Sequence, residues 1–231
     1  MDVPLYCYQH MFQGCTSLTQ APELPAITLG DNCYRYMFKD CTSLTSAPDL
    51  PSTILFESCY ENMFQGCTSL TQAPELPAKA LAHYCYYYMF QGCTSLTQAP
   101  ELPAITLGDN CYRYMFHGCT SLTQAPELPA ITLGNSCYFC MFQGCTSLTQ
   151  APSILPATTM TSYCYRSMFS NCISLTQAPV LLATTLYSNC YVDMFYGCTH
   201  ITSVTMKNAV KPYDSSKYGD LGNDITINYV D

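Results

Sequence analysis

The sequence has no tryptophan and few charged residues. Asp, Glu, Lys and Arg together make up 10% of its 231 residues, against about a quarter in a typical soluble domain. Lysine and arginine total 8, acidic residues total 16, and the net charge is −8. A nucleic-acid-binding surface needs clustered basic residues. This balance therefore argues against a nucleic-acid partner.

Long apolar runs and catalytic motifs are also missing. The sequence holds no stretch of 18 or more apolar residues, so we expect no transmembrane segment. It has no glycine-rich phosphate loop, no HExxH and no nucleophile elbow. Its 4 histidines follow no metal-ligand spacing. We therefore expect neither an enzyme nor a bound cofactor or metal.

A repeat of 26 residues fills most of the chain. A Met-Phe pair marks each copy, at Met11, Met37, Met63, Met89, Met115, Met141, Met168 and Met194. One step is 27 residues long, because "APSILPATTM" carries an extra residue. A fixed period in this range is typical of solenoids, whose repeats bury their apolar faces on one another. We expect residues 1–198 to form an eight-repeat solenoid, and residues 199–231 to be a C-terminal cap or the start of a following segment.

One repeat suggests a short helix followed by a short strand. Cys33, Met37 and Cys41 are four residues apart, as on one face of a helix. Most copies have Gly before the second cysteine and the others have Asp or Asn, and all three tolerate the left-handed conformation that ends a helix. We expect a helix over about 33–39 and a strand near 44–47 that stops before the next proline. Stacking then gives short parallel strands on one face and short helices on the other.

The motif MFxGCTSLT, followed by an extended proline- or leucine-bearing segment, resembles the BspA-like leucine-rich repeat surface proteins. Phe12, Cys15 and Leu18 carry it in the first copy, and the resemblance covers about residues 7–205. It implies a leucine-rich-repeat-like α/β solenoid that is exposed at a cell surface and has a role in adhesion. The first cysteine of each copy and the regular prolines depart from the family pattern.

The sequence has 17 cysteines, and all but Cys140 fall into pairs with the same spacing. A ladder of buried thiols, one disulfide per repeat, and a metal site are the possible interpretations. Residues eight apart in a continuous helix lie about 12 Å apart, beyond the roughly 6.8 Å that a disulfide allows between Cα atoms. A disulfide therefore requires the helix to end before the second cysteine, as the glycine indicates. We favour disulfides over thiols, in the pairs Cys7–Cys15, Cys33–Cys41, Cys59–Cys67, Cys85–Cys93, Cys111–Cys119, Cys137–Cys145, Cys164–Cys172 and Cys190–Cys198.

Comparison of the copies separates fixed positions from variable ones. A tyrosine follows each first cysteine and predicts a stacked, half-buried column. The next two positions vary, so we expect them, Cys140 included, to face solvent. Tyr and Arg at such positions are typical of interface hot spots, although a tolerant surface row is the alternative. The candidate contact residues are Tyr36, Tyr87, Tyr88, Arg113 and Tyr114.

An acidic residue occupies one further position in successive copies. In water, stacked carboxylates about 5 Å apart repel each other by less than about 1 kcal/mol, and salt screens this repulsion. A solvated row is therefore tolerable. A stripe that binds a divalent cation or a cationic partner is the alternative. The residues of the row are Glu23, Asp49, Glu75, Glu101 and Glu127.

These observations predict a non-enzymatic, surface-exposed binding or adhesion solenoid that recognises a protein or glycan partner. A structural spacer that presents another domain is the alternative. The start, MDVPLYCYQH, lacks the basic and apolar regions of a signal peptide and lies almost inside a repeat. We therefore expect a fragment of a protein that is secreted or held at the cell surface.

Overall fold

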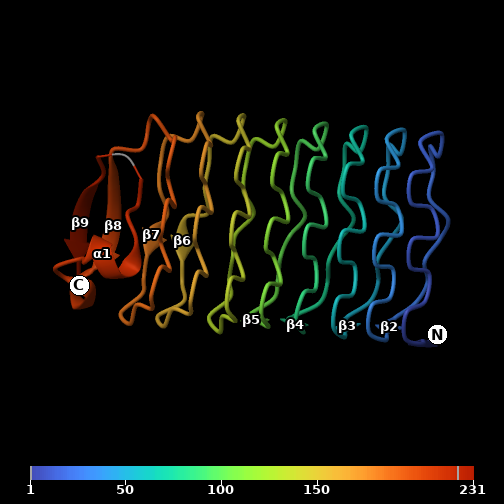
Figure 1. The fold of residues 1–231 in the computed structure, drawn as a ribbon, viewed down its shortest axis with the longest axis horizontal. Helices are drawn as coiled ribbons and strands as arrows, with labels where there is room; N and C mark the ends of the chain where they lie inside the picture. The colour runs from blue at the N-terminus through green and yellow to red at the C-terminus, as the bar shows by residue number, and fades with distance from the viewer. Residues whose placement is uncertain (1, 223) are drawn as a thin grey trace.

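The repeats form a single stack of coils. The computed structural model describes residues 2–222 and 224–231. Each coil is one repeat, and consecutive coils lie side by side from the N-terminal end to the C-terminal end (Figure 1). The strand pairing between coils is parallel, with Thr28 opposite Ile54 and Leu29 opposite Leu55. The predicted repeat solenoid with short parallel strands is therefore confirmed.

The paired strands are very short in the repeats and longer in the tail. Strands β1 to β7 have two residues each, whereas β8 and β9 have five. The strands form the sheets β1-β2-β3, β4-β5 and β6-β7-β8-β9. Their bounds are β1 Asp2–Val3, β2 Thr28–Leu29, β3 Ile54–Leu55, β4 Ala80–Leu81, β5 Thr106–Leu107, β6 Ile154–Leu155, β7 Val180–Leu181, β8 Ser203–Lys207 and β9 Thr226–Val230.

The main pairing in the early repeats is displaced from the predicted strand. Strands β2 to β5 lie just before the first cysteine of a repeat. The segment 44–47 contributes only isolated bridges, from Ser46 to Gln20 and to Gln72. Pro48 follows two residues later and has no N–H group with which to extend the ladder. Pairing at this position therefore stops before the proline, as expected.

The helix predicted over 33–39 is wrong. Tyr34 and Tyr36 have positive φ angles of 59° and 58°. The N–H groups of Tyr36 and Phe38 donate to Glu61 O at 2.9 Å and Met63 O at 3.0 Å, which belong to the next coil. The N–H groups between them close tight turns within the coil. The segment is therefore a ribbon of turns in which alternate N–H groups donate to a neighbouring coil, mostly to the following one, whereas the N–H of Tyr34 donates back to Cys7 O at 3.0 Å.

The apolar pattern explains the error. Cys33, Tyr34, Met37 and Phe38 are buried, whereas the residues between these pairs lie on the outside. This burial has a period of four, which is close to the 3.6 residues of a helical turn. A helix would bond its N–H groups internally, whereas the turn ribbon uses them to hold the next coil. The ladder must offset about 1–2 kcal/mol for each non-glycine residue in the left-handed conformation.

Aromatic side chains form two continuous columns inside the solenoid. Tyr34 stacks on Tyr60 with ring centroids 5.9 Å apart, and Phe38 stacks on Phe64 at 5.6 Å. The tyrosine column is therefore present, but it is fully buried from Tyr34 onward rather than half-buried. Each ring contacts its own copy in the neighbouring repeat, so one register aligns the whole core.

The cysteines are thiols in the structure and not the predicted disulfides. The Sγ of Cys41 donates to Phe12 O at 3.0 Å, and the Sγ of Cys67 donates to Phe38 O at 3.1 Å. Most of the buried thiols thus bond a carbonyl of the preceding coil, and the two members of a pair such as Cys59–Cys67 bond different carbonyls and stand in different columns. Cys140 was expected to be exposed, but its side chain is buried.

The tail continues the stack with a different structure. Strand β8 pairs with β7 and β9 pairs with β8, so both extend the last sheet. The short helices η1 (Asn208–Val210) and α1 (Ser215–Tyr218) lie between them. The tail thereby covers the coil that contains Tyr191, whose ring contacts Tyr213 at 6.3 Å.

Native alkylation tests the thiol columns. Cys15 is exposed and Cys7 is partly buried, whereas the remaining cysteines are buried. We expect iodoacetamide to label only Cys15 and Cys7 in the folded protein, and all 17 cysteines after denaturation without reductant. Mass spectrometry reports both counts. A single labelled cysteine after denaturation would instead establish the eight disulfides that the sequence favoured.

Alkaline pH should unfold the protein. Burial raises the pKa of Cys59 from its ordinary value of 9.0 to about 12, and that of Cys164 to about 11. Because the fold favours the neutral thiol, the contribution is fully present below pH 9 and is lost as pH rises toward these values. Thermal unfolding in reductant should therefore show a steady fall in melting temperature above pH 9. A melting temperature that stays flat to pH 11 would contradict burial of the thiols.

Two glycines test the close approach of neighbouring coils. A Cβ added to Gly134 would lie 2.4 Å from the backbone carbon of Gly108, whereas one added to Gly118 would meet nothing within 4 Å. We expect Gly134→Ala to destabilise the protein by about 3 kcal/mol, because the coils must separate. Gly118→Ala should cost only about 1 kcal/mol, for its positive φ. Urea denaturation compares the two variants, and equal costs would contradict the stacking.

Candidate partner-binding surface

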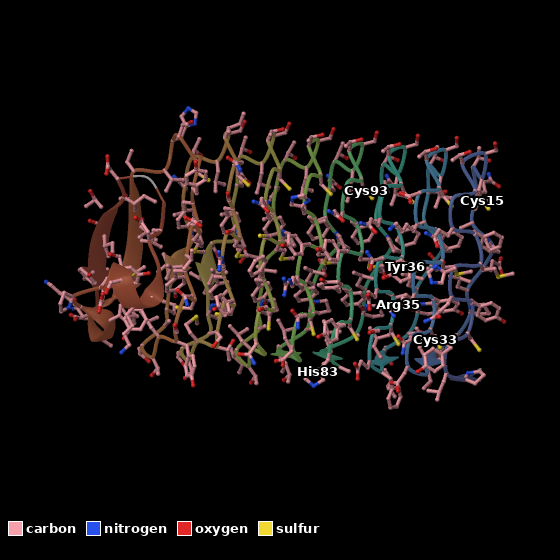
Figure 2. The ribbon with its side chains drawn as sticks, in the orientation of Figure 1. Cys15, Cys33, Arg35, Tyr36, His83 and Cys93 are labelled. Atoms are coloured by element: carbon pink, nitrogen blue, oxygen red, sulfur yellow. The ribbon has the colours of Figure 1, made fainter. Side chains whose placement is uncertain are left out.

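The variable positions line one outer wall of the solenoid. We define the variable face as the second and third residues after the first cysteine of each repeat. Arg35 and Tyr36 represent it in Figure 2, where they lie between the levels of Cys33 and Cys93. The wall is formed by the turn ribbon, which points two residues inward and the next two outward. This alternation places both variable positions outside the aromatic columns, although neighbouring side chains bury Glu61, Asn62 and Cys140.

Four of the five candidate contact residues form one cluster. Tyr88 stacks on Tyr114 with centroids 4.6 Å apart and an interplanar angle of 5°. Tyr87 meets Tyr88 edge to face at 4.3 Å, and the guanidinium of Arg113 lies 5.4 Å from the Tyr114 ring. All four side chains are half-buried. They were expected to face solvent fully, but contacts between neighbouring repeats cover part of each.

Tyr36 lies apart from this cluster. It stacks on His10 at 4.6 Å and carries Arg35 above its ring at 4.9 Å. Arg35 also forms a salt bridge of 2.7 Å with Glu61, whose side chain is 6% exposed. Asn62, which is buried, occupies the equivalent position in the next repeat. The structure therefore separates Tyr36 from the Tyr87–Tyr114 cluster by one polar repeat.

The structure adds residues that sequence comparison missed. Phe139 contacts Tyr114 at 5.4 Å, and the guanidinium of Arg113 lies 4.4 Å from its ring. Arg166 approaches the same ring to 5.7 Å. A usable signal was present, because Arg35, Arg113 and Arg166 are the only arginines of the chain and share one repeat position.

The acidic row lies on a different surface. The segment Pro22–Pro25, which carries Glu23, lines the same hollow as the buried side chains of Tyr34 and Met37. The acidic segments therefore lie on the opposite side of the core from the variable face. The five carboxylates are exposed. Glu127 alone among them accepts hydrogen bonds within the described residues, from the backbone N and the Oγ of Ser153 at 3.2 and 3.1 Å. Solvated carboxylates of this kind fit the predicted solvated row.

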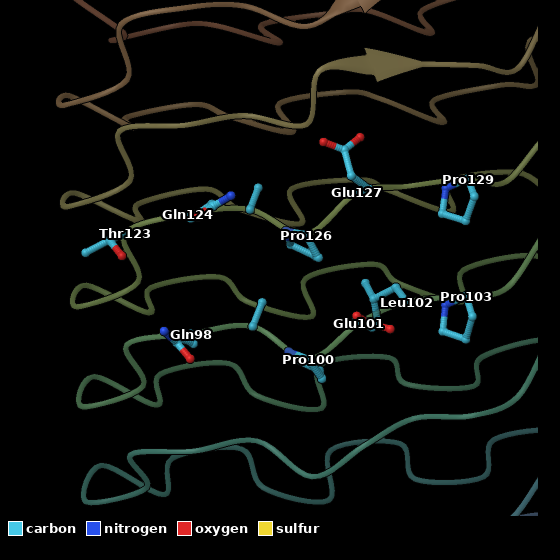
Figure 3. Close-up of a pocket in the computed structure, with 12 residues that line it drawn as sticks. Gln98, Pro100, Glu101, Leu102, Pro103, Thr123, Gln124, Pro126, Glu127 and Pro129 are labelled. Carbon is cyan, nitrogen blue, oxygen red and sulfur yellow. The ribbon is translucent and has the colours of Figure 1, made fainter.

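Shallow grooves separate the acidic residues. One has a volume of about 450 Å³ and lies between the Pro100–Pro103 and Pro126–Pro129 segments. Figure 3 shows these prolines, with Glu101 and Glu127 beside them. A similar groove of about 440 Å³ precedes it, beside Glu75. Sequence reasoning missed these grooves, because they arise only when two proline-bracketed segments stack.

Neither a metal site nor a membrane span is found in the described part of the chain. No three of its His, Cys, Asp and Glu side chains gather in a way that would hold an ion. No helix within residues 2–222 and 224–231 is long and apolar enough to cross a bilayer. The acidic row thus offers single carboxylates rather than a coordination sphere.

Comparison with known families agrees with the repeat architecture. A model described as "BspA type Leucine rich repeat region (6 copies)" matches residues 6–123 and 109–223. The chain therefore belongs to the BspA-type leucine-rich repeat family, as its motif indicated. No curated protein matches this chain.

One solved structure is similar to this chain. It is a leucine-rich cell surface protein from Faecalibacterium prausnitzii, and the match has 16% sequence identity and a TM-score of 0.40. The match covers 96% of this chain and 75% of the other chain. A similarity this low supports no statement about the function of the present chain.

Proposed function

We propose that this chain is a non-enzymatic binding solenoid of a cell-surface or secreted protein, which captures a partner through its variable face. The family membership supports a role in protein binding or adhesion. The observation that carries the proposal is the composition of this face. In a chain with 10% charged residues, it holds every arginine and a cluster of half-buried tyrosines. Tyr and Arg are the side chains that most often dominate interface energy.

The arrangement of the rings favours a protein over a glycan as the partner. Sugars bind aromatic side chains mainly by lying against a ring face. One ring face of Tyr88 and one of Tyr114 are covered because the two rings stack on each other. Tyr87 and Tyr88 meet edge to face, so a further ring face in this pair is covered. Ring edges, hydroxyl groups and guanidinium groups then remain for contact. These groups suit the hydrogen-bonding surface of a polypeptide.

Replacement of the half-buried pair Tyr87 and Tyr88 tests this proposal. We expect Tyr87→Ala/Tyr88→Ala to weaken binding at least tenfold, or about 1.4 kcal/mol, on immobilised matrix glycoproteins and mucins. The unfolding midpoint should change little, because both side chains lie outside the core columns. The matched control is Tyr187→Ala, which removes an exposed tyrosine from another position of the repeat.

Two outcomes would contradict the proposal. One is equal binding by the wild-type protein and the tyrosine variant on every surface tested. The other is equal loss in the Tyr187→Ala control, which would show that the variable face has no special role. Either outcome would favour the alternative, a spacer that presents another domain.

A further inference from the structure

The variable face contains two cations that no acidic side chain neutralises. Arg113 and Arg166 stand on the repeats before and after Phe139, with their guanidinium carbons 4.4 and 5.7 Å from its ring. Within residues 2–222 and 224–231, no carboxylate lies within salt-bridge distance of either arginine, since Arg35–Glu61 is the one ion pair there. The Nε of Arg113 is buried and has no hydrogen-bond partner.

An equivalent arginine in the same chain shows what is missing. Arg35 and Arg113 occupy the same repeat position in the identical segment ITLGDNCYRYMF. Both donate from Nη1 to the Asn three residues earlier, at 3.5 and 3.0 Å. In the next repeat, however, Arg35 meets Glu61 at 2.7 Å. Arg113 meets Phe139 at that position.

The two arginines differ in their carboxylate partner and not in Nε, which lacks a hydrogen-bond partner in both. Phe139 provides a flat surface for both guanidinium groups, which cation–π contact stabilises without neutralising the charge. Guanidinium groups bind carboxylates with two parallel hydrogen bonds. Because Phe139 stands where Arg35 has Glu61, the guanidinium of Arg113 has no carboxylate partner within the described residues and can donate to one from outside.

We propose that Arg113, Phe139 and Arg166 form a binding site for a carboxylate side chain in an acidic, extended peptide segment of the partner. This inference rests on the proposed role of the variable face and names the chemistry of its ligand. Charge complementarity supports it, because these cations stand on a protein whose net charge is −8. A polyanion is repelled by most of the surface and attracted at this place.

A charged peptide provides the direct test. The probe is a biotinylated peptide of ten glutamates, measured by biolayer interferometry against the full chain, with a ten-glutamine peptide as the neutral control. We expect the glutamate peptide to bind at least tenfold more tightly than the glutamine peptide at 50 mM salt. Binding should weaken at least tenfold at 500 mM salt, because salt screens exposed charges.

Three variants locate the site. Phe139→Glu supplies an internal carboxylate where the chain already tolerates Glu61, so the fold should persist while peptide binding falls at least tenfold. Arg113→Ala/Arg166→Ala should lose binding to the same extent. Lys79→Ala removes one exposed positive charge elsewhere and should change binding less than twofold. The reciprocal change, Glu61→Gln, exposes Arg35 and should increase binding.

The outcomes separate this inference from the proposed function. Equal binding of both peptides, or equal loss in Lys79→Ala and Phe139→Glu, would overturn the carboxylate site. The carboxylate site would also be overturned if a sulfated polysaccharide bound and the glutamate peptide did not, with polysaccharide binding lost in Phe139→Glu and kept in Lys79→Ala. If the tyrosine pair is nevertheless needed for binding to matrix glycoproteins, the proposed function stands without this ligand. If the glutamate peptide shows no preference and the tyrosine pair is not needed either, both the carboxylate site and the proposed function are overturned.

Discussion

The hydrogen bonds between consecutive coils are the constraint on which the rest of the structure depends. Because Tyr36 and Phe38 donate to the following coil, each repeat must lie in fixed register with the next. Identical residues then stack on one another, and the tyrosine, phenylalanine and cysteine columns follow from that register. No single repeat could bury these side chains by itself, since each coil provides only one layer of the core.

This constraint also explains the unusual backbone. Left-handed conformations at tyrosine are unfavourable for a side chain with a Cβ atom, yet the chain adopts them repeatedly, as at Tyr34 and Tyr60. Alternation of conformations turns every second N–H toward the neighbour, which an α-helix cannot do. The energy cost within each coil is therefore offset between coils, and the ladder and the conformation depend on each other.

The sequence predicted what repeats and missed what arises between repeats. The period, the stacked tyrosines and the left-handed residue before the second cysteine, such as Gly66 with a φ of 74°, all follow from comparing copies. The helix was wrong because burial with a period of four resembles helical spacing. The disulfides were inferred within one repeat, whereas stacking places Cys41 and Cys67 in one column. The contact of Arg113 with Phe139 also crosses repeats, so no single copy reveals it.

Fixed and variable positions of the repeat differ in whether their side chains point into the core. Positions that point inward cannot vary without disturbing a column, whereas the variable face accepts Arg, Tyr, Glu or Phe from one coil to the next. Contacts on this face therefore depend on which residues happen to be neighbours, as Arg35 with Glu61 and Arg113 with Phe139 demonstrate. A chain of nearly identical repeats can in this way acquire distinct local chemistry without a change of fold.

The forward direction of the N–H groups has an electrical consequence. Along the wall formed by the turn ribbon, N–H groups such as those of Tyr36 and Phe38 point toward the C-terminal end, and the carbonyl groups that accept from them point back. The N–H of Tyr34 points the opposite way, toward Cys7 O, but the forward bonds outnumber it, so a net dipole accumulates along the rod as it does in a helix. This wall therefore has a partial negative charge at its N-terminal end and a partial positive charge at its C-terminal end, so the solenoid is a vectorial object although its repeats are nearly alike.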